Sequence, residues 1–111
     1  MFKYDIDYLL NAKEGQQFER KSARIDPKDP ANTVIALANA DGGIIAIGIH
    51  NGKVEGINNY PAKTDDFIQV SVDFCNPTVK VIPHFLKCKN YLKNEDRILI
   101  IRSRAKRKGA C

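Results

Sequence analysis

Asn39-Ala40-Asp41-Gly42-Gly43-Ile44-Ile45-Ala46-Ile47-Gly48 is the stretch that decides the fold of this chain. It ends an apolar, alanine-rich run, residues 33–40, that is typical of a helix. Gly42 or Gly43 can adopt the left-handed backbone in which helices commonly end. The apolar, β-branched run that follows predicts a strand over residues 43–50. A helix that passes at once into a strand indicates a compact α+β domain.

The segments before this stretch predict a short helix, a strand and a longer helix. Residues 4–11 have the apolar spacing of a helix, and residues 17–22 read as a first strand. Asp29 is a suitable N-cap and Pro30 fits the first helical position, so we expect a helix that runs to about Asn39.

The segments after it predict a hairpin and a second long helix. Asn51-Gly52 is a strong signal for a two-residue hairpin turn, and residues 53–56 form the short return strand. Thr64 is expected to cap a helix that has Asp65 and Asp66 in its first turn and ends at Asn76-Pro77.

The last third of the chain predicts an antiparallel pair of strands. Residues 78–92 read either as one long strand with a break at Pro83 or as two strands. Residues 94–96 turn the chain, and residues 97–102 return. We therefore expect an α+β fold with a mixed, largely antiparallel sheet, two main helices on one face and a short N-terminal helix.

Size and composition favour one domain that stays out of the membrane. The chain has 111 residues, of which 43% are apolar, and no run approaches the 18 to 20 apolar residues of a membrane span. The N-terminus lacks a secretory signal, so we expect a cytoplasmic protein. We assign residues 1–103 to the domain and residues 104–111 to a basic tail without fixed structure.

The net charge of +5 is concentrated at the C-terminal end. All 13 acidic residues precede residue 97, whereas residues 97–111 carry six basic residues and no acid. Such a block either attracts phosphates or is merely a solvated end of the chain. If the first and last strands share a side of the sheet, their cations form one phosphate-binding surface. The candidate nucleic-acid-binding residues are Arg20, Lys21, Arg24, Arg102, Arg104, Lys106, Arg107 and Lys108.

Three carboxylates offer an alternative chemistry. Glu14, Glu19 and Asp41 would hold Mg²⁺ or Mn²⁺ for phosphodiester hydrolysis if they faced one cleft. They would otherwise be surface groups that pair with neighbouring arginines and lysines. The glycines match no phosphate-binding loop, and the cysteines and histidines lack zinc-ligand spacing, so we expect no metal and no cofactor.

These motifs together resemble the Schlafen AlbA-type (AlbA_2) domain over residues 14–102. The matching segments are Glu14, Phe18-Glu19-Arg20-Lys21, Ala36-Leu37-Ala38-Asn39, Gly42-Gly43, Gly48-Ile49 and Gly56-Ile57. The resemblance implies an Alba-like fold in which Asn39, Gly42, Gly43 and Gly48 shape the helix–strand junction.

The resemblance also implies a function. The family is known as a DNA-binding module of bacterial transcriptional regulators, so nucleic acid, DNA rather than RNA, is the expected partner, with a homodimer as an option. RNA-cleaving Schlafens have a third acid just after the Gly-Ile pair, where this chain has His50 and Asn51. A binding domain is therefore the first hypothesis, and a Mg²⁺- or Mn²⁺-dependent ribonuclease or an oligomerisation module is the alternative.

Overall fold

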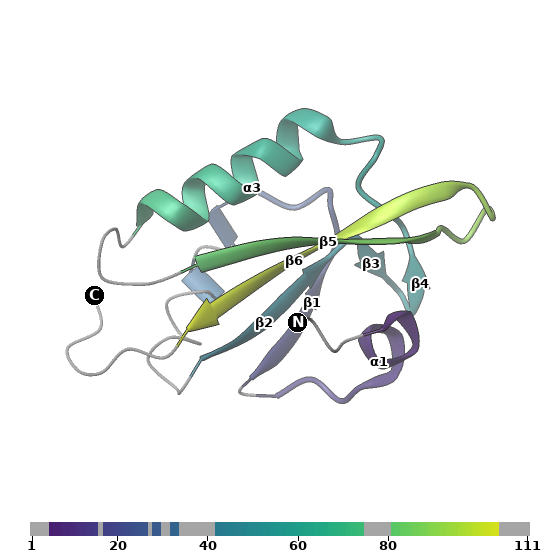
Figure 1. The fold of residues 1–111 in the computed structure, drawn as a ribbon, viewed down its shortest axis with the longest axis horizontal. Coiled ribbons are helices and arrows are strands. Elements are labelled where there is room, and N and C mark those ends of the chain that lie inside the picture. The colour runs from purple at the N-terminus through teal and green to yellow at the C-terminus, as the bar shows by residue number, and fades with distance from the viewer. Residues whose placement is uncertain are drawn as a thin grey trace.

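The computed structural model describes residues 5–15, 17–26, 28–29, 32–33, 42–74 and 81–104. It is an α+β structure in which strands form the centre and helices lie outside them (Figure 1). The elements are α1 (Ile6–Asn11), β1 (Phe18–Lys21), β2 (Gly42–Ile47), β3 (Ile49–His50), β4 (Lys53–Val54), α3 (Pro61–Phe74), β5 (Val81–Lys89) and β6 (Glu95–Arg104).

Four strands form the main sheet in the order β1-β2-β6-β5. β1 pairs with β2 in parallel, whereas β6 pairs antiparallel with both β2 and β5. The sheet is therefore mixed and largely antiparallel, as the sequence predicts. Strands β3 and β4 form a separate two-stranded hairpin around the Asn51-Gly52 turn, also as predicted.

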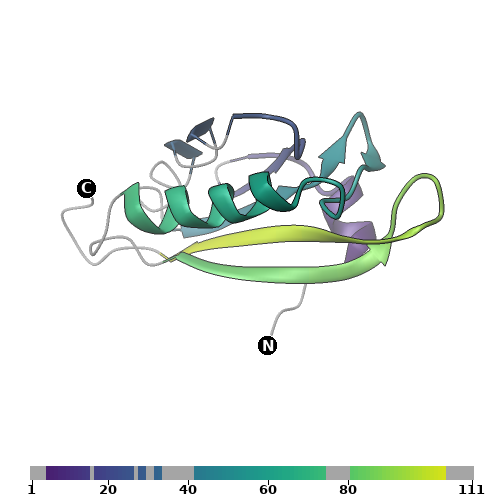
Figure 2. The same cartoon turned by 90° about the horizontal axis from the view of Figure 1, so that it is seen from above.

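Each face of the main sheet carries its own core, because side chains alternate along a strand. Phe67 of α3 packs with Ile45, Leu99 and Ile101 on one side, which we call the α3 face. On the other side, the α1 face, Leu9 packs in a cluster that includes Ala46, Ile98 and Ile100. In both views α3 runs along β5 and β6 (Figure 2). β6 thus supplies residues to both cores.

The long helix predicted for residues 30–39 is described only at its beginning. Residues 28–29 and 32–33 are helical, and residues 34–41 lie outside the described residues. Of the two main helices expected on one face of the sheet, only α3 is described in full and can be placed on a face.

Several element boundaries differ from the sequence prediction. α3 begins at Pro61 rather than after Thr64, because proline suits the first helical position. Thr64 lies inside the helix, where its backbone N and Oγ1 both donate to the Tyr60 carbonyl, at 2.9 and 2.8 Å. The predicted strand 43–50 is divided at Gly48, whose φ of +115° turns the chain from β2 into β3.

The β5–β6 hairpin also differs from the prediction. β5 is one strand through Pro83, because β5 lies at the sheet edge, where a missing N–H is tolerated. The turn lies at residues 90–94, and the Asn90 N–H donates to the Asn94 carbonyl at 3.0 Å. Glu95 and Asp96, predicted as part of the turn, already belong to β6.

Among the described residues, no helix combines the length and the apolar character needed to cross a bilayer.

Candidate nucleic-acid interface

The two cations of β1 point to opposite faces of the sheet. Arg20 is in register with Ala46, whose side chain belongs to the α1 face, whereas Lys21 is in register with Ile47, on the α3 face. The expected convergence of all β1 and β6 cations on one surface is therefore wrong for this pair, because neighbouring residues of a strand face opposite sides.

Arg20 is largely occupied within the protein. Its Nε donates to the Leu9 carbonyl at 2.6 Å, and a terminal nitrogen donates to the Ala12 carbonyl. The guanidinium also lies 4.8 Å from the Phe18 ring centre and 3.4 Å from Glu14 Oε2. Only 16% of the Arg20 side chain is exposed. Because its hydrogen bonds go to the Leu9 and Ala12 carbonyls, Arg20 ties the end of α1 to β1.

Lys21 and Glu19 form an ion pair on the α3 face, with 2.7 Å between Nζ and Oε2. The alternative that a candidate carboxylate pairs with a neighbouring lysine is thus confirmed for Glu19. Both side chains are about 30% exposed, which means that the pair remains in contact with solvent.

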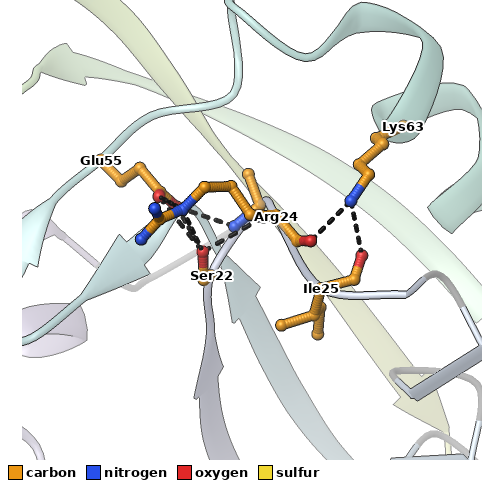
Figure 3. Close-up of polar contacts among 6 residues, drawn as sticks. Ser22, Arg24, Ile25, Glu55 and Lys63 are labelled. Carbon is orange, nitrogen blue, oxygen red and sulfur yellow. Dashed lines mark hydrogen bonds and ion pairs between the residues drawn. The ribbon is translucent and has the colours of Figure 1, made fainter.

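Arg24 lies beyond β1 and belongs to a polar network around Glu55 (Figure 3). Arg24 Nε is 2.8 Å from Glu55 Oε2, and Glu55 Oε1 accepts from the Ser22 hydroxyl at 2.9 Å and from the Ala23 N–H at 2.8 Å. On the other side of this loop, Lys63 Nζ donates to the Arg24 carbonyl at 2.5 Å. The network fixes the loop after β1 between β4 and α3.

Sequence reasoning missed Glu55. In the structure only 13% of its side chain is exposed. The alternation in Lys53-Val54-Glu55 directs Val54 inward and predicts an exposed Glu55. The only available signal was Gly56, which allows the chain to turn away after the strand.

Two of the three candidate carboxylates, Glu14 and Glu19, form separate ion pairs. Glu14 pairs with Arg20, and Glu19 pairs with Lys21. The two pairs belong to different faces of the sheet, because Arg20 is in register with Ala46 and Lys21 with Ile47. Asp41 lies outside the described residues. No group of three potential metal ligands forms among the residues that the structure covers.

Arg102 is a candidate cation that the structure leaves exposed. It is exposed on the α1 face of β6, in register with Ile44, and makes no ion pair within the described residues. From the strand spacing, its Cα lies about 12 Å from that of Arg20 on the same face. Arg104 ends β6 opposite Gly42, and Lys106, Arg107 and Lys108 lie outside the described residues.

The glycines of the motif bring the strands close together. Gly42 and Gly43 open β2, and a Cβ on Gly43 would lie 2.5 Å from the Gln17 carbonyl oxygen. Gly48 donates to the Lys21 carbonyl at 2.8 Å and thereby joins the hairpin to β1. Asn39 lies outside the described residues.

A buried carboxylate, Asp96, fixes the other side of this region. Its Oδ1 accepts from the N–H groups of Ile57, Asn58 and Arg97, and its Oδ2 accepts from the Asn90 amide at 3.0 Å. Burial raises the pKa of this carboxyl, but the hydrogen bonds from Asn58, Asn90, Arg97 and Ile57 outweigh it and lower the pKa below its ordinary value. Asp96 is therefore a structural anion that ties segment 56–58 to the β5–β6 hairpin.

Comparison with known proteins identifies the domain. The model of the family described as Schlafen, AlbA_2 matches residues 14–110. Among curated proteins, the sequence has no match. The match covers most of the chain and includes β1, the Gly42-Gly43 junction and β6. The chain therefore belongs to the Schlafen AlbA_2 family.

Proposed function

We propose that this chain is a nucleic-acid-binding domain that contacts the phosphate backbone of DNA and serves a bacterial transcriptional regulator in the cytoplasm. Membership of the AlbA_2 family supports a function related to nucleic acid. The observation that carries the proposal is Arg102, an exposed cation without an ion pair in the described residues, at the start of a basic segment that contains no acid.

The surface cations divide into two groups in this proposal. Arg20 and Lys21 mainly stabilise the fold, since acids or carbonyls already bind them. Arg102, Arg104, Lys106, Arg107 and Lys108 supply the long-range attraction to phosphates. Arg24 contributes through the part of its guanidinium that Glu55 leaves free. A homodimer would add a second such segment to the same DNA.

The salt dependence of binding tests the proposal. If four to six phosphates are contacted, log K falls with log salt at a slope of about −4 to −5 for duplex DNA, from about −0.9 per phosphate. A fluorescein-labelled 20-base-pair duplex, titrated by anisotropy between 50 and 200 mM NaCl, measures this slope. A slope near zero contradicts the proposal.

Two charge-matched variants locate the interface. Replacing Arg102, Arg104, Arg107 and Lys108 by glutamine is expected to remove most of the slope. The control replaces Lys13, Lys28, Lys87 and Lys89 by glutamine, because these exposed lysines lie elsewhere and remove the same charge. Equal losses in the two variants would show that only net charge matters.

A further inference from the structure

A hollow of about 290 Å³ lies at the end of the molecule where the β3–β4 hairpin meets the β5–β6 turn. Its lining comes from four separate segments: the loop after β1, the hairpin, the residues before α3 and the β5–β6 turn. The lining includes Arg24, His50, Lys53, Tyr60 and Tyr91. A volume near 300 Å³ is at the low end for ligand pockets and suits one small ligand.

The walls of this hollow are held in place by bonds that do not depend on a ligand. The Tyr91 N–H donates to the Val54 carbonyl at 2.8 Å, which fixes the β5–β6 turn to β4. Asn90 Oδ1 accepts from the Leu92 N–H at 2.9 Å, and Asn90 Nδ2 is bound to Asp96. The Glu55 network holds Arg24, which also lines the hollow. The hollow is therefore preformed, and it lies between segments that are distant in the sequence.

The chemistry of the lining fits a nucleotide. Tyr91 is 58% exposed and Tyr60 is half-buried, so both offer ring surface for a base to stack on. Lys53 is exposed and makes no ion pair among the described residues. Arg24 binds Glu55 through Nε, and its side chain is 54% exposed. These two cations suit a phosphate.

The acid and the amides of the hollow are consistent with this ligand. Glu55 is the acidic group in the lining, but Ser22, Ala23 and Arg24 already bind its carboxylate. Asn51 and Asn59 are exposed in the lining, and an amide can both donate to and accept from the edge of a base.

A second hollow adjoins the first. It shares His50 and Asn51 with the first and is also lined by the ion-paired Glu14, Arg20 and Lys21 and by Ser22, which directly follows β1. A base enters such a hollow only when it is unstacked, as in a single strand or at a frayed end.

We propose that this hollow binds one nucleotide of a single-stranded nucleic acid, with the base on Tyr91 and the phosphate on Lys53 and Arg24. The inference rests on the proposed nucleic-acid function and adds to it the form of the ligand and its specific contacts.

Anisotropy titrations with labelled dT12, rU12 and a 12-base-pair duplex test the inference. Tyr91→Ala is expected to weaken dT12 or rU12 binding by roughly 5- to 100-fold, the range found for loss of one base–aromatic stack. Tyr91→Phe keeps the ring and is expected to bind within about twofold of the natural protein. Lys53→Gln should flatten the single-strand salt slope by about 0.7, the value for one phosphate. The stronger of the two single strands shows whether the hollow prefers the thymidine or the uridine nucleotide.

Phe85→Ala is the matched control, because Phe85 is 45% exposed and lies outside the hollow. Equal effects of Tyr91→Ala and Phe85→Ala on single-strand binding overturn the inference. If duplex binding still depends on Arg102 and the basic segment in that case, the proposed function stands without the hollow. If neither single strand nor duplex binds, the proposed function and the inference both fail.

Discussion

Replacing Asp96 by alanine is expected to destabilise the fold by about 3 kcal/mol. Asp96 is 5% exposed and accepts four hydrogen bonds. Ile57 N–H has a second acceptor in the Arg97 carbonyl at 3.0 Å, and Asn58 is exposed, so water can replace the carboxylate at both. The hydrogen bonds from Arg97 and Asn90 are lost without a replacement, and each contributes about 1.5 kcal/mol because the acceptor is charged.

The close packing of the Asp96 carboxyl group against Gly56 can be tested separately. A Cβ at Gly56 would lie 2.1 Å from Asp96 Cγ, and the φ of Gly56 is +83°. Gly56→Ala alone is therefore expected to cost more than 3 kcal/mol, through the clash and the left-handed backbone together. In the Asp96→Ala background the clash with the carboxyl group is absent, and the cost of Gly56→Ala should fall toward the about 1 to 2 kcal/mol of backbone strain.

The contribution of Asp96 also has a defined pH dependence. Because the folded-state pKa is lowered, the stabilisation is complete above the unfolded pKa of about 3.9 and is lost as the pH falls through the folded value. The difference in unfolding free energy between the natural protein and Asp96→Asn should therefore shrink below about pH 4.

Urea unfolding followed by circular dichroism, at pH 7 and at pH 3, measures these quantities. The reasoning is refuted if Asp96→Ala costs less than 1 kcal/mol at pH 7. It is also refuted if the costs of Gly56→Ala and Asp96→Ala are additive, since the two side chains would then not share a space.

Two further substitutions test the β1 region by the same urea assay. Glu55→Ala should cost about 2 kcal/mol, because Ser22, Ala23 and Arg24 lose a shared partner, whereas Glu95→Ala, which removes an exposed pair with Lys89 at 3.8 Å, should cost under about 0.5 kcal/mol. Similar costs for the two would contradict a structural role for Glu55. Gly43→Ala should cost more than about 2 kcal/mol, because its Cβ meets the Gln17 carbonyl, while Gly15→Ala, which meets nothing within 4 Å, should stay within about 0.5 kcal/mol. A mild Gly43→Ala would mean that β1 can move away from β2.

Local patterns in the sequence predicted most of the elements. The Asn51-Gly52 turn, the short α1 and the succession of helices and strands along the chain follow from spacing and turn residues. The Lys21–Glu19 pair was also within reach, because the two residues are two apart on one strand. The opposite orientation of Arg20 and Lys21 follows from the same rule, so a single surface formed by both was excluded by strand geometry alone.

Contacts between distant segments could not be predicted in this way. Glu55 binds Ser22 from 33 residues away, and Asp96 binds Ile57 from 39 residues away. Nothing in the local pattern tells these carboxylates from exposed ones such as Glu95. The division at Gly48 was hidden for a related reason, since the residues on both sides of it are buried and read as one apolar run.

The alternation along β6 has a consequence for how the molecule loses its structure. Ile98 and Ile100 belong to the α1 face, Leu99 and Ile101 belong to the α3 face, and all four are fully buried. The layers above and below the sheet are consequently coupled through one backbone. Damage on either side should lower the protection of β6 amides from hydrogen exchange, and the two layers should melt as one cooperative unit.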